Sequence, residues 1–476
     1  MRIKKKTLFW LVFFLVIYIV ISCIEVADLS KTEQIACYRR CGMFAIVLFV
    51  LQLWSLKSTM GRIVSPYVIF LASFACFCSG QAMVYAFYME EFIETDIAKI
   101  TSYSDVLRAT YLSMQCLVAF HCGALLFLGK GAKHKRLEMY EDGAVRERAA
   151  IYSVGSLIFF VTFIPMFLFT AYLLVTAMDI GYLAINDRSS STLITKIMSY
   201  VSLYFQCSAV LCLVGSRNNK RRFDRYLLAV AVYAASMLMM GERTEPTAQL
   251  IFAFWLRSKY FGAAKKSQYL PLVVLVLALF IIFPAIMKNR YGGLITMDVL
   301  ITAVRENNIF SILAESIAAL GYSIFPLTMT MNIVPSAEPY RYGITYLAAL
   351  TGVIPFLGIA NRYAGLGTWL KKELSMSYGP GFSIPAEVYI NFGPYVFVPM
   401  LVIGLLMAKF LHFEGRDGKI NYTNLMVSGM VLITQVTLPR REFLGAVRDI
   451  FYVMIPIYLA VRHICRKRED KDDFEN

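Results

Sequence analysis

Long apolar runs separated by short polar stretches dominate the sequence. The first run follows the basic start MRIKKK, and others lie near residues 42–55, 63–88, 108–128, 151–178, 192–215, 226–240, 245–256, 269–287, 393–411, 422–438 and 446–462. A helix needs about 20 apolar residues to cross the hydrocarbon core of a bilayer, so the pattern predicts an all-α polytopic integral membrane protein with about 12 transmembrane helices. We interpret the first run as an uncleaved helix, because further spans follow at once.

The charges between these runs predict which side of the membrane each loop faces. If the N-terminus is cytoplasmic, the inside loops include GKGAKHKRLEMYEDGAVRER, RNNKRRFDR and RSKYFGAAKK, which are clearly basic. The outside loops then include the acidic stretch MEEFIETDIAKITSYSD. Because cytoplasmic loops of membrane proteins carry an excess of Lys and Arg, this alternation predicts that both termini are cytoplasmic.

One segment, from about residue 288 to residue 390, interrupts this rhythm. It contains two weakly apolar runs, SILAESIAALGYSIFPLTMTMNIV and GITYLAALTGVIPFLGIA, which Gly, Pro and charged residues break up. We expect helices at the membrane surface or re-entrant segments, and about fourteen spans if both runs cross. The predicted parts are N-terminal membrane helices (1–287, about nine), a long extracytoplasmic loop (288–390), C-terminal membrane helices (391–463, about three) and a cytoplasmic tail (464–476).

Composition agrees with a membrane protein. Of the 476 residues, 58% are hydrophobic and 17% are charged, whereas soluble domains carry about 25% charged residues. Ordinary soluble, disordered and disulfide-scaffold classes are therefore excluded. The net charge of +15 is better assigned to membrane orientation than to nucleic-acid binding, because the cations lie in loops beside apolar runs.

Arginines on the predicted outer side violate the charge rule that the other loops obey. They are Arg243, Arg290, Arg305, Arg341, Arg362, Arg440, Arg441 and Arg448. A guanidinium group binds phosphate or carboxylate through two parallel hydrogen bonds and keeps its charge. Such a set beside the bilayer suits an anionic, lipid-borne ligand such as a lipid pyrophosphate. The alternative is that each arginine pairs with a loop carboxylate or a lipid headgroup.

Arg243 is the sharpest of these cases. It lies in LMMGERTEPTAQLIFAFW, where an outside turn joins two apolar helices. A charge at the centre of a membrane helix costs about 2.5–3.5 kcal/mol on insertion scales, which argues for a partner or a task. Glu242 and Glu245 are the structural alternatives to a ligand. In LPRREFLGAVRDIF, Arg441 and Arg448 are spaced to share a helical face.

A third motif, SYGPGFSIPAEVYINFGPYVFVPM, carries a carboxylate and an amide. Glu387 and Asn391 are four residues apart on a predicted helix that enters the membrane, so they lie on one face. Glu387 is a candidate general base toward a sugar hydroxyl. It is equally a candidate for orienting an arginine, and helix-start stabilisation is a third interpretation.

Several sequence motifs of known enzyme and transporter classes are absent. There is no G-x-x-x-x-G-K-[ST] loop and no G-x-S-x-G elbow, so neither ATP-driven transport nor a serine hydrolase is predicted. The histidines fall in predicted spans or toward the cytoplasmic side, so histidine catalysis on the outer side is not expected. No Asp-x-Asp pair lies in the first outside loop, and the acidic run 90–96 is interpreted as a solvated face. The sequence predicts neither a metal nor a cofactor.

At three places the sequence resembles a known family. MGERTEP, YRYGITYLAAL with IPFLG, and PGFSIPAEVYINFG are similar to motifs of the Wzy-type repeat-unit polymerases of O-antigen and capsule synthesis. The likeness is clearest from about residue 225 onward. Two departures are Glu242, where the family usually has a smaller residue, and the absence of a histidine from the large loop.

The resemblance implies a GT-C-like polymerase/ligase fold in the bacterial inner membrane. It implies a metal-independent glycosyltransferase that moves a growing glycan from undecaprenyl pyrophosphate onto a lipid-linked repeat unit at the outer leaflet. By motif position Arg243 and Glu387 carry over as catalytic residues. The candidates for substrate binding, which rest on sidedness and helix faces, are Arg290, Arg341, Arg440, Arg441, Arg448 and Asn391.

The expected partners are the lipid-linked oligosaccharide and the bilayer, together with a chain-length regulator and a flippase. Two other classes remain open. A lipid-linked oligosaccharide flippase or exporter would line the middle of its spans with cations, and these spans are nearly free of charge. A membrane sugar acyltransferase would need a histidine near its acyl donor, and none is well placed.

Overall fold

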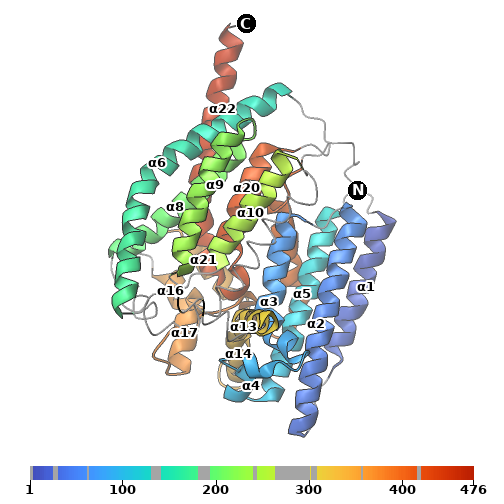
Figure 1. The fold of residues 1–476 in the computed structure, drawn as a ribbon. Helices are drawn as coiled ribbons and strands as arrows, with labels where there is room; N and C mark the ends of the chain where they lie inside the picture. The colour runs from blue at the N-terminus through green and yellow to red at the C-terminus, as the bar shows by residue number, and fades with distance from the viewer. Residues whose placement is uncertain are drawn as a thin grey trace. The chain divides into compact units, whose positions relative to one another are not determined.

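The computed structural model is helical throughout the residues that it describes (Figure 1). These residues are 4–24, 30–61, 64–129, 141–180, 193–239, 244–262, 308–354, 358–414 and 420–475, with residues 298 and 301. Within them the only β-type pairing is an isolated bridge between Glu414 and Ile420. The helices form two compact units.

Unit 1 draws on residues 1–132, 313–410 and 437–448. Its helices are α1 (Lys5–Ser22), α2 (Lys31–Met60), α3 (Pro66–Tyr85), η1 (Glu90–Phe92), α4 (Ile97–Ile100), α5 (Tyr103–Leu128), most of α13 (Ile309–Gly321), η3 (Tyr322–Ile324), α14 (Phe325–Ile333), α15 (Ile344–Thr351), α16 (Ile359–Ala364), α17 (Leu366–Glu373), α18 (Ile384–Phe392), α19 (Phe397–Phe410), η4 (Leu438–Arg440) and α21 (Phe443–Asp449).

Unit 2 draws on residues 133–312, 411–436 and 449–476. Its helices are α6 (Glu141–Ile180), α8 (Leu193–Gly215), α9 (Lys220–Met239), α10 (Thr244–Tyr260), α20 (Tyr422–Gln435), the π-helical stretch η5 (Ile450–Met454) and α22 (Ile455–Glu475). The α6 and α8 helices pack closely at Gly155 and Gly215, where a Cβ would press on Leu211 and on Tyr152 respectively. Several cations of this unit are paired, including Arg257 with Asp224 at 3.0 Å.

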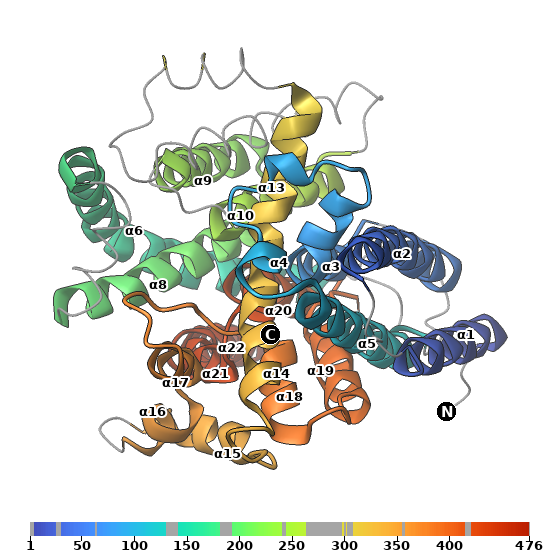
Figure 2. The same cartoon turned by 90° about the horizontal axis from the view of Figure 1, so that it is seen from below.

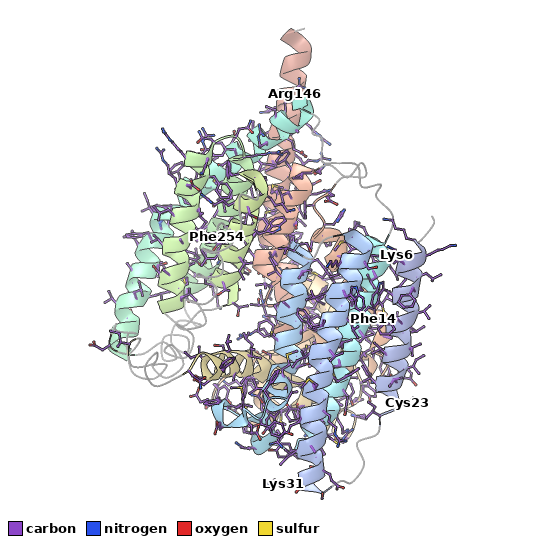
Figure 3. The ribbon with its side chains drawn as sticks, turned by 45° about the vertical axis from the view of Figure 1, so that its right-hand side comes forward. Lys6, Phe14, Cys23, Lys31, Arg146 and Phe254 are labelled. Atoms are coloured by element: carbon purple, nitrogen blue, oxygen red, sulfur yellow. The ribbon has the colours of Figure 1, made fainter. Side chains whose placement is uncertain are left out.

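α5 forms the centre of unit 1, with α1, α2 and α19 packed around it. At Gly123 on α5 and Gly404 on α19, an added Cβ would overlap a backbone carbonyl of the facing helix. Only glycine permits this close approach, as is common where helices pack in membranes. Figure 3 labels Lys6 and Cys23 at opposite ends of α1, with Lys31 of α2 near the Cys23 end, so α1 and α2 run in opposite directions.

Eight segments of the described chain are long and apolar enough to cross a membrane. They are Lys5–Ser22, Lys31–Met60, Pro66–Tyr85, Tyr103–Leu128, Ala144–Thr176, Leu193–Gly215, Phe310–Ile333 and Phe443–Lys467. The predicted all-α, polytopic class is therefore confirmed. The predicted runs at 226–240, 245–256, 393–411 and 422–438 form α9, α10, α19 and α20, and the run at 269–287 lies outside the described residues. The number of spans stays a prediction.

The predicted long loop begins with residues that the structure leaves undescribed and continues as short helices. Phe310–Ile333 meets the length and apolarity that a span requires. It is divided by η3, however, and Figure 3 shows α13 (yellow) lying across the direction of α1 and α2. Beyond α14, helices of six to nine residues, α15 to α18, lead to α19. These short helices carry the candidate site.

Candidate active site

The sequence SIPAEVYINFG builds α18, the helix at the centre of the site. The Ser383 hydroxyl accepts a hydrogen bond from the Ala386 amide, and Pro385 occupies the first turn, where its missing N–H costs nothing. Gly393 ends the helix with a φ of 60°, which favours glycine. Every residue from Ile384 to Asn391 is buried. The helix therefore holds its polar side chains, Glu387 and Asn391, inside unit 1.

Glu387 is fully buried, and both of its carboxylate oxygens accept hydrogen bonds. Thr345 Oγ1 donates to Oε1 at 3.0 Å, and the Phe443 amide donates to Oε2 at 2.6 Å. Burial raises the pKa of the Glu387 carboxyl to about 7, although the hydrogen bonds from Phe443 and Thr345 oppose the rise. The carboxylate thus joins three segments of unit 1 that are far apart in sequence: α18, α15 and the turn before α21.

Asn391 completes a buried chain of hydrogen bonds on the same face of α18. Its Nδ2 donates to Thr345 Oγ1 at 2.7 Å and to the Glu387 carbonyl at 2.7 Å. Its Oδ1 accepts from the Gly343 amide at 2.9 Å. Gly343 has a φ of 86° and precedes α15. Asn391 therefore fixes the start of α15. The Thr345 hydroxyl accepts a hydrogen bond from Asn391 and donates one to Glu387.

Arg341 lies beside this chain and is engaged by protein groups. Its Nη2 lies 3.4 Å from Glu338 Oε2, and its Nη1 donates to the Tyr363 carbonyl at 3.3 Å. The guanidinium also stacks over the Trp369 ring, 4.8 Å from its centre, while Trp369 Nε1 donates to Glu338. For this arginine the structure shows the alternative considered from sequence, pairing with a loop carboxylate.

The turn at 440–443 brings arginines to the opposite side of the Glu387 carboxylate. Glu442 Oε2 accepts a hydrogen bond from the Gly367 amide at 2.9 Å at the start of α17. Phe443 donates to Glu387, so two carboxylates hold this turn. Burial raises the pKa of the Glu442 carboxyl, while backbone hydrogen bonds from Gly367 and Leu366 and the charges of Arg448 and Arg441 oppose the rise.

The three arginines of this region differ in their surroundings. The Arg441 guanidinium lies against Gly445, where an added Cβ would come within 2.8 Å of Nη2. Arg448 Nη2 donates to Asn361 Oδ1 at 2.9 Å. Arg440 is exposed and lies over the Phe77 ring at 5.6 Å. Arg441 and Arg448 therefore both act on Glu442, and Arg440 lies toward α3.

The structure brings together some of the residues predicted from sequence. Glu387 and Asn391 share the Thr345 hydroxyl, and the 440–443 turn, which carries Arg441, is bonded to Glu387 through the Phe443 amide. The charge of Arg341 acts on Glu387, and that of Arg441 acts on Glu442. Arg243 and Arg290 lie outside the described residues. Sequence reasoning missed Thr345, Glu442 and Gly445. Thr345 and Glu442 could have been considered as site residues, since they lie within the motifs YRYGITYLAAL and LPRRE that the sequence analysis singled out.

A correction concerns the acidic run 90–96, which the sequence suggested was a solvated face. Asp96 is instead buried and accepts hydrogen bonds from Tyr85 Oη at 2.6 Å and from the Ala98 amide at 3.1 Å. Glu90 pairs with Arg39, whose guanidinium also stacks over Tyr88. Glu91 and Glu94 are exposed, as the sequence suggested. The interpretation is wrong for Asp96, which caps a short helix, and for Glu90, which pairs with an arginine of α2.

Metal ligands do not gather in the described part of the chain, where no group of three His, Cys, Asp or Glu side chains is placed to hold an ion. The polar cluster consists instead of a carboxylate, a hydroxyl, an amide and nearby guanidinium groups. This set suits binding of an anionic substrate and orientation of neighbouring groups more than metal chemistry.

Comparison with known proteins identifies the family. The model of the family described as O-antigen polysaccharide polymerase Wzy matches residues 7–468, nearly the whole chain. No curated protein and no solved structure matches it. The match confirms the resemblance carried by the three motifs and extends it to the first half of the chain. With its apolar helices, this places the protein in the bacterial inner membrane as a multi-pass protein of polysaccharide biosynthesis. The chain belongs to the O-antigen polysaccharide polymerase Wzy family.

Proposed function

We propose that the protein transfers a growing glycan from undecaprenyl pyrophosphate onto a lipid-linked repeat unit at the outer leaflet. Membership of the Wzy family supports polymerisation of repeat units. The observation that carries the site assignment is the hydrogen bond from the Phe443 amide to buried Glu387, which joins the Thr345–Asn391 chain to the arginine-bearing turn. We further propose a GT-C-like arrangement, with residues 288–390 facing outward and both termini cytoplasmic.

The proposed reaction forms one glycosidic bond and breaks one bond to phosphate. A hydroxyl oxygen of the acceptor sugar attacks the anomeric carbon of the donor glycan. The bond between that carbon and the pyrophosphate oxygen breaks, and its electron pair leaves with the pyrophosphate. The acceptor hydroxyl gives up its proton to a base. Negative charge grows on the leaving group, so fixed guanidinium groups there lower the barrier.

In this proposal arginines bind the pyrophosphate and no metal is needed. Residues 440–448 hold three arginines against one glutamate, so the segment carries excess positive charge. Arg441 and Arg448, whose charges act on Glu442, are the substrate-binding candidates of this segment, with Arg440 on the exposed side. Arg243 and Arg290 keep their predicted roles toward the same ligand. Arg341, already paired with Glu338, contributes positive charge from the side.

Glu387 and Asn391 act as positioning residues in this scheme. Both Glu387 oxygens are occupied by donors from the protein, which supports orientation of the turn over proton transfer as its main task. The sequence left open whether Glu387 is a general base or orients an arginine by a salt bridge. Its hydrogen-bond donors are a hydroxyl and a backbone amide, so we propose instead that it orients the arginine-bearing turn through the backbone. A base for the acceptor hydroxyl then comes from another group or from a phosphate oxygen of the substrate.

Purified protein in lipid nanodiscs, incubated with undecaprenyl-pyrophosphate-linked repeat units, tests this function. We expect a ladder of polymer lengths on a gel, and we expect it to persist with a metal chelator present. Absence of any ladder from folded protein would reject the polymerase assignment. Loss of the ladder with chelator, restored by Mg²⁺ or Mn²⁺, would reject metal independence. Addition of a chain-length regulator or flippase partner should change ladder length without being required for bond formation.

A further inference from the structure

The α15 helix is apolar on both faces. Its inner face presents Thr345, Ala348 and Ala349, which are buried. The two alanines belong to a core cluster with Ala360, Ala364, Leu444 and Val447. Its outer face presents Ile344, Leu347 and Leu350, which are 50%, 68% and 55% exposed. A helix on a water-facing surface carries polar residues on that side, so this outer face is not built for water.

The same character continues into α16. Ile354 and Ile359 are 53% and 44% exposed, and α15 and α16 pack side by side. Figure 2 shows the two helices at the margin of unit 1, with α15 beside α18. The sequence from residue 344 to residue 361 contains no charged residue. Together these side chains form one apolar face, made of Ile344, Leu347, Leu350, Ile354 and Ile359.

The ends of this apolar face carry the residues that mark a membrane boundary. Arg341 precedes it and Arg362 follows it. Tyr342 is 77% exposed and Tyr363 is 43% exposed. Helices that lie in the plane of a membrane interface combine an apolar face with cations, and tyrosines gather at the level of the lipid headgroups.

A second helix of unit 1 exposes a similar apolar side. α19, an apolar helix, exposes Val398, Val402 and Leu406 along one side. Tyr395, 81% exposed, stands just before it. α15 packs on α18, and α18 leads through Gly393 into α19. Through α18, the apolar face of α15 and α16 is therefore connected to α19, which exposes side chains of the same kind and also has a tyrosine at one end.

We propose that the apolar face of α15 and α16 inserts among the acyl chains of one bilayer leaflet, with both helices lying along the membrane interface. Because Thr345 lies on the opposite side of α15 and bonds Glu387, the insertion sets the depth of the candidate site. The site then lies at the level of the lipid phosphates, where a lipid-linked pyrophosphate is presented. This consequence rests on the proposed function, and the insertion itself does not.

Spin labels on the full-length protein in nanodiscs test the insertion without any activity measurement. Single cysteines replace Leu347, Val402 and Lys372 in an active background whose native cysteines are substituted. We expect the label at Leu347 to be accessible to oxygen and inaccessible to a water-soluble nickel chelate, as at Val402. Lys372, an exposed residue of α17, provides the water-accessible control.

Two other results would overturn the insertion. Access of the nickel chelate to Leu347, as at Lys372, would mean that the face lies in water. Exclusion of both oxygen and chelate would mean that a second copy of the chain or another segment covers it.

The consequence for the candidate site is tested by a separate activity measurement. Leu347→Glu with Leu350→Glu should cut polymer formation at least tenfold at equal abundance, while Leu347→Met with Leu350→Met should keep it. Full activity of the glutamate variant would reject the link to the site and leave the spin-label result to judge the insertion.

Discussion

Two buried carboxylates in unit 1 have the same kinds of partner and hold very different parts of the chain. Asp96 accepts one hydroxyl, from Tyr85, and one backbone amide, from Ala98. Glu387 likewise accepts one hydroxyl, from Thr345, and one backbone amide, from Phe443. The Asp96 partners lie 11 and 2 residues away, and those of Glu387 lie 42 and 56 residues away.

This difference separates a local cap from a tie between distant segments. Asp96 caps α4 and has its own cation, Lys99, at 3.4 Å. It secures a short loop and nothing beyond it. Glu387 holds α15 on one oxygen and the arginine-bearing turn on the other. Although the two carboxylates are similarly buried and bonded, Asp96 stabilises local structure. In our proposal, Glu387 instead positions the groups that bind the substrate.

The largest loss of polymerisation rate is expected for substitutions of Arg441, in the turn that Glu387 holds. Arg441→Ala removes the charge-assisted contact that we propose with the pyrophosphate, so it should lower the polymerisation rate by about 10²–10³. Arg441→Lys keeps the charge but loses the planar guanidinium group, so its rate should lie between those of wild type and Arg441→Ala. The measurement is ladder formation by purified protein, normalised to membrane abundance. Lys372→Ala is the matched control, and equal rates for the alanine variants at 441 and 372 would remove Arg441 from the site.

Glu387→Gln should have the next largest effect. A glutamine side chain turns an NH₂ group toward one of the two donors, and an unsatisfied buried donor costs about 1–3 kcal/mol. We expect a loss of about ten- to a hundredfold in rate if that cost falls on the active arrangement. Thr345→Ala should lower activity in the same way, and Thr345→Ser, which keeps the hydroxyl, should restore it. Failure of serine to restore activity would argue that the threonine methyl group, not its hydroxyl, matters.

Gly445→Ala should act through Arg441 alone. The new methyl group would displace the end of the Arg441 side chain, which is flexible, so the fold should tolerate it. We expect a loss of about tenfold in rate, equivalent to about 1.4 kcal/mol of barrier, with an unchanged unfolding temperature. Gly379→Ala is the control, because a Cβ there would meet no atom within 4 Å. A drop in unfolding temperature in Gly445→Ala would contradict this reason.

The raised pKa of Glu387 predicts a pH dependence of stability. Its pKa rises from 4.5 in the unfolded chain to about 7 in the folded protein. The folded state therefore binds a proton more tightly, and the carboxyl's contribution to stability is lost as the pH rises from 4.5 through 7. For a pKa difference of 2.5, at about 1.4 kcal/mol for each pKa unit, the full loss is about 3 kcal/mol. Thermal unfolding at pH 5 to 8 should show wild type losing stability relative to Glu387→Gln, and parallel curves would contradict the assignment.

The smallest effect is expected at the local cap. Asp96→Asn keeps an acceptor for Tyr85 or Ala98 and stays far in sequence from the arginine turn. Polymerisation should change by less than about twofold, or about 0.4 kcal/mol of barrier. The same ladder assay with a parallel abundance measurement checks this. A loss as large as that of Glu387→Gln at normal abundance would erase the distinction between the two carboxylates.

Local patterns in the sequence predicted a good part of this architecture. Apolar runs located the long helices, and a spacing of four residues placed Glu387 and Asn391 on one face of α18. Family motifs pointed to the segments that form the cluster, and the family match confirmed the resemblance. These signals depend on neighbouring residues or on whole segments, so they can be recognised without knowing the tertiary contacts.

The sequence did not predict which distant groups meet. Nothing in the periodicity of YRYGITYLAAL indicates that the Thr345 hydroxyl bonds Glu387, or that the amide of Phe443 reaches the other oxygen. Two members of the acidic run, Glu90 and Asp96, were misjudged for the same reason, because only tertiary packing buries Asp96 against Tyr85 and brings Arg39 to Glu90. Arg341 shows the intermediate case, in which Glu338, three residues away, was a visible partner and the Trp369 ring was not.

The central claim is that Glu387 holds the arginine-bearing turn through the Phe443 amide. Hydrogen–deuterium exchange of the peptide covering residues 438–448, measured in nanodiscs for wild type, Glu387→Met and Asp96→Asn, tests it most directly. We expect faster exchange in this peptide for Glu387→Met, because methionine has a similar length but no oxygen to accept the hydrogen bond from the Phe443 amide, and no change for Asp96→Asn. Unchanged exchange in an inactive Glu387→Met protein would contradict the claim and would indicate that Glu387 acts on the substrate itself.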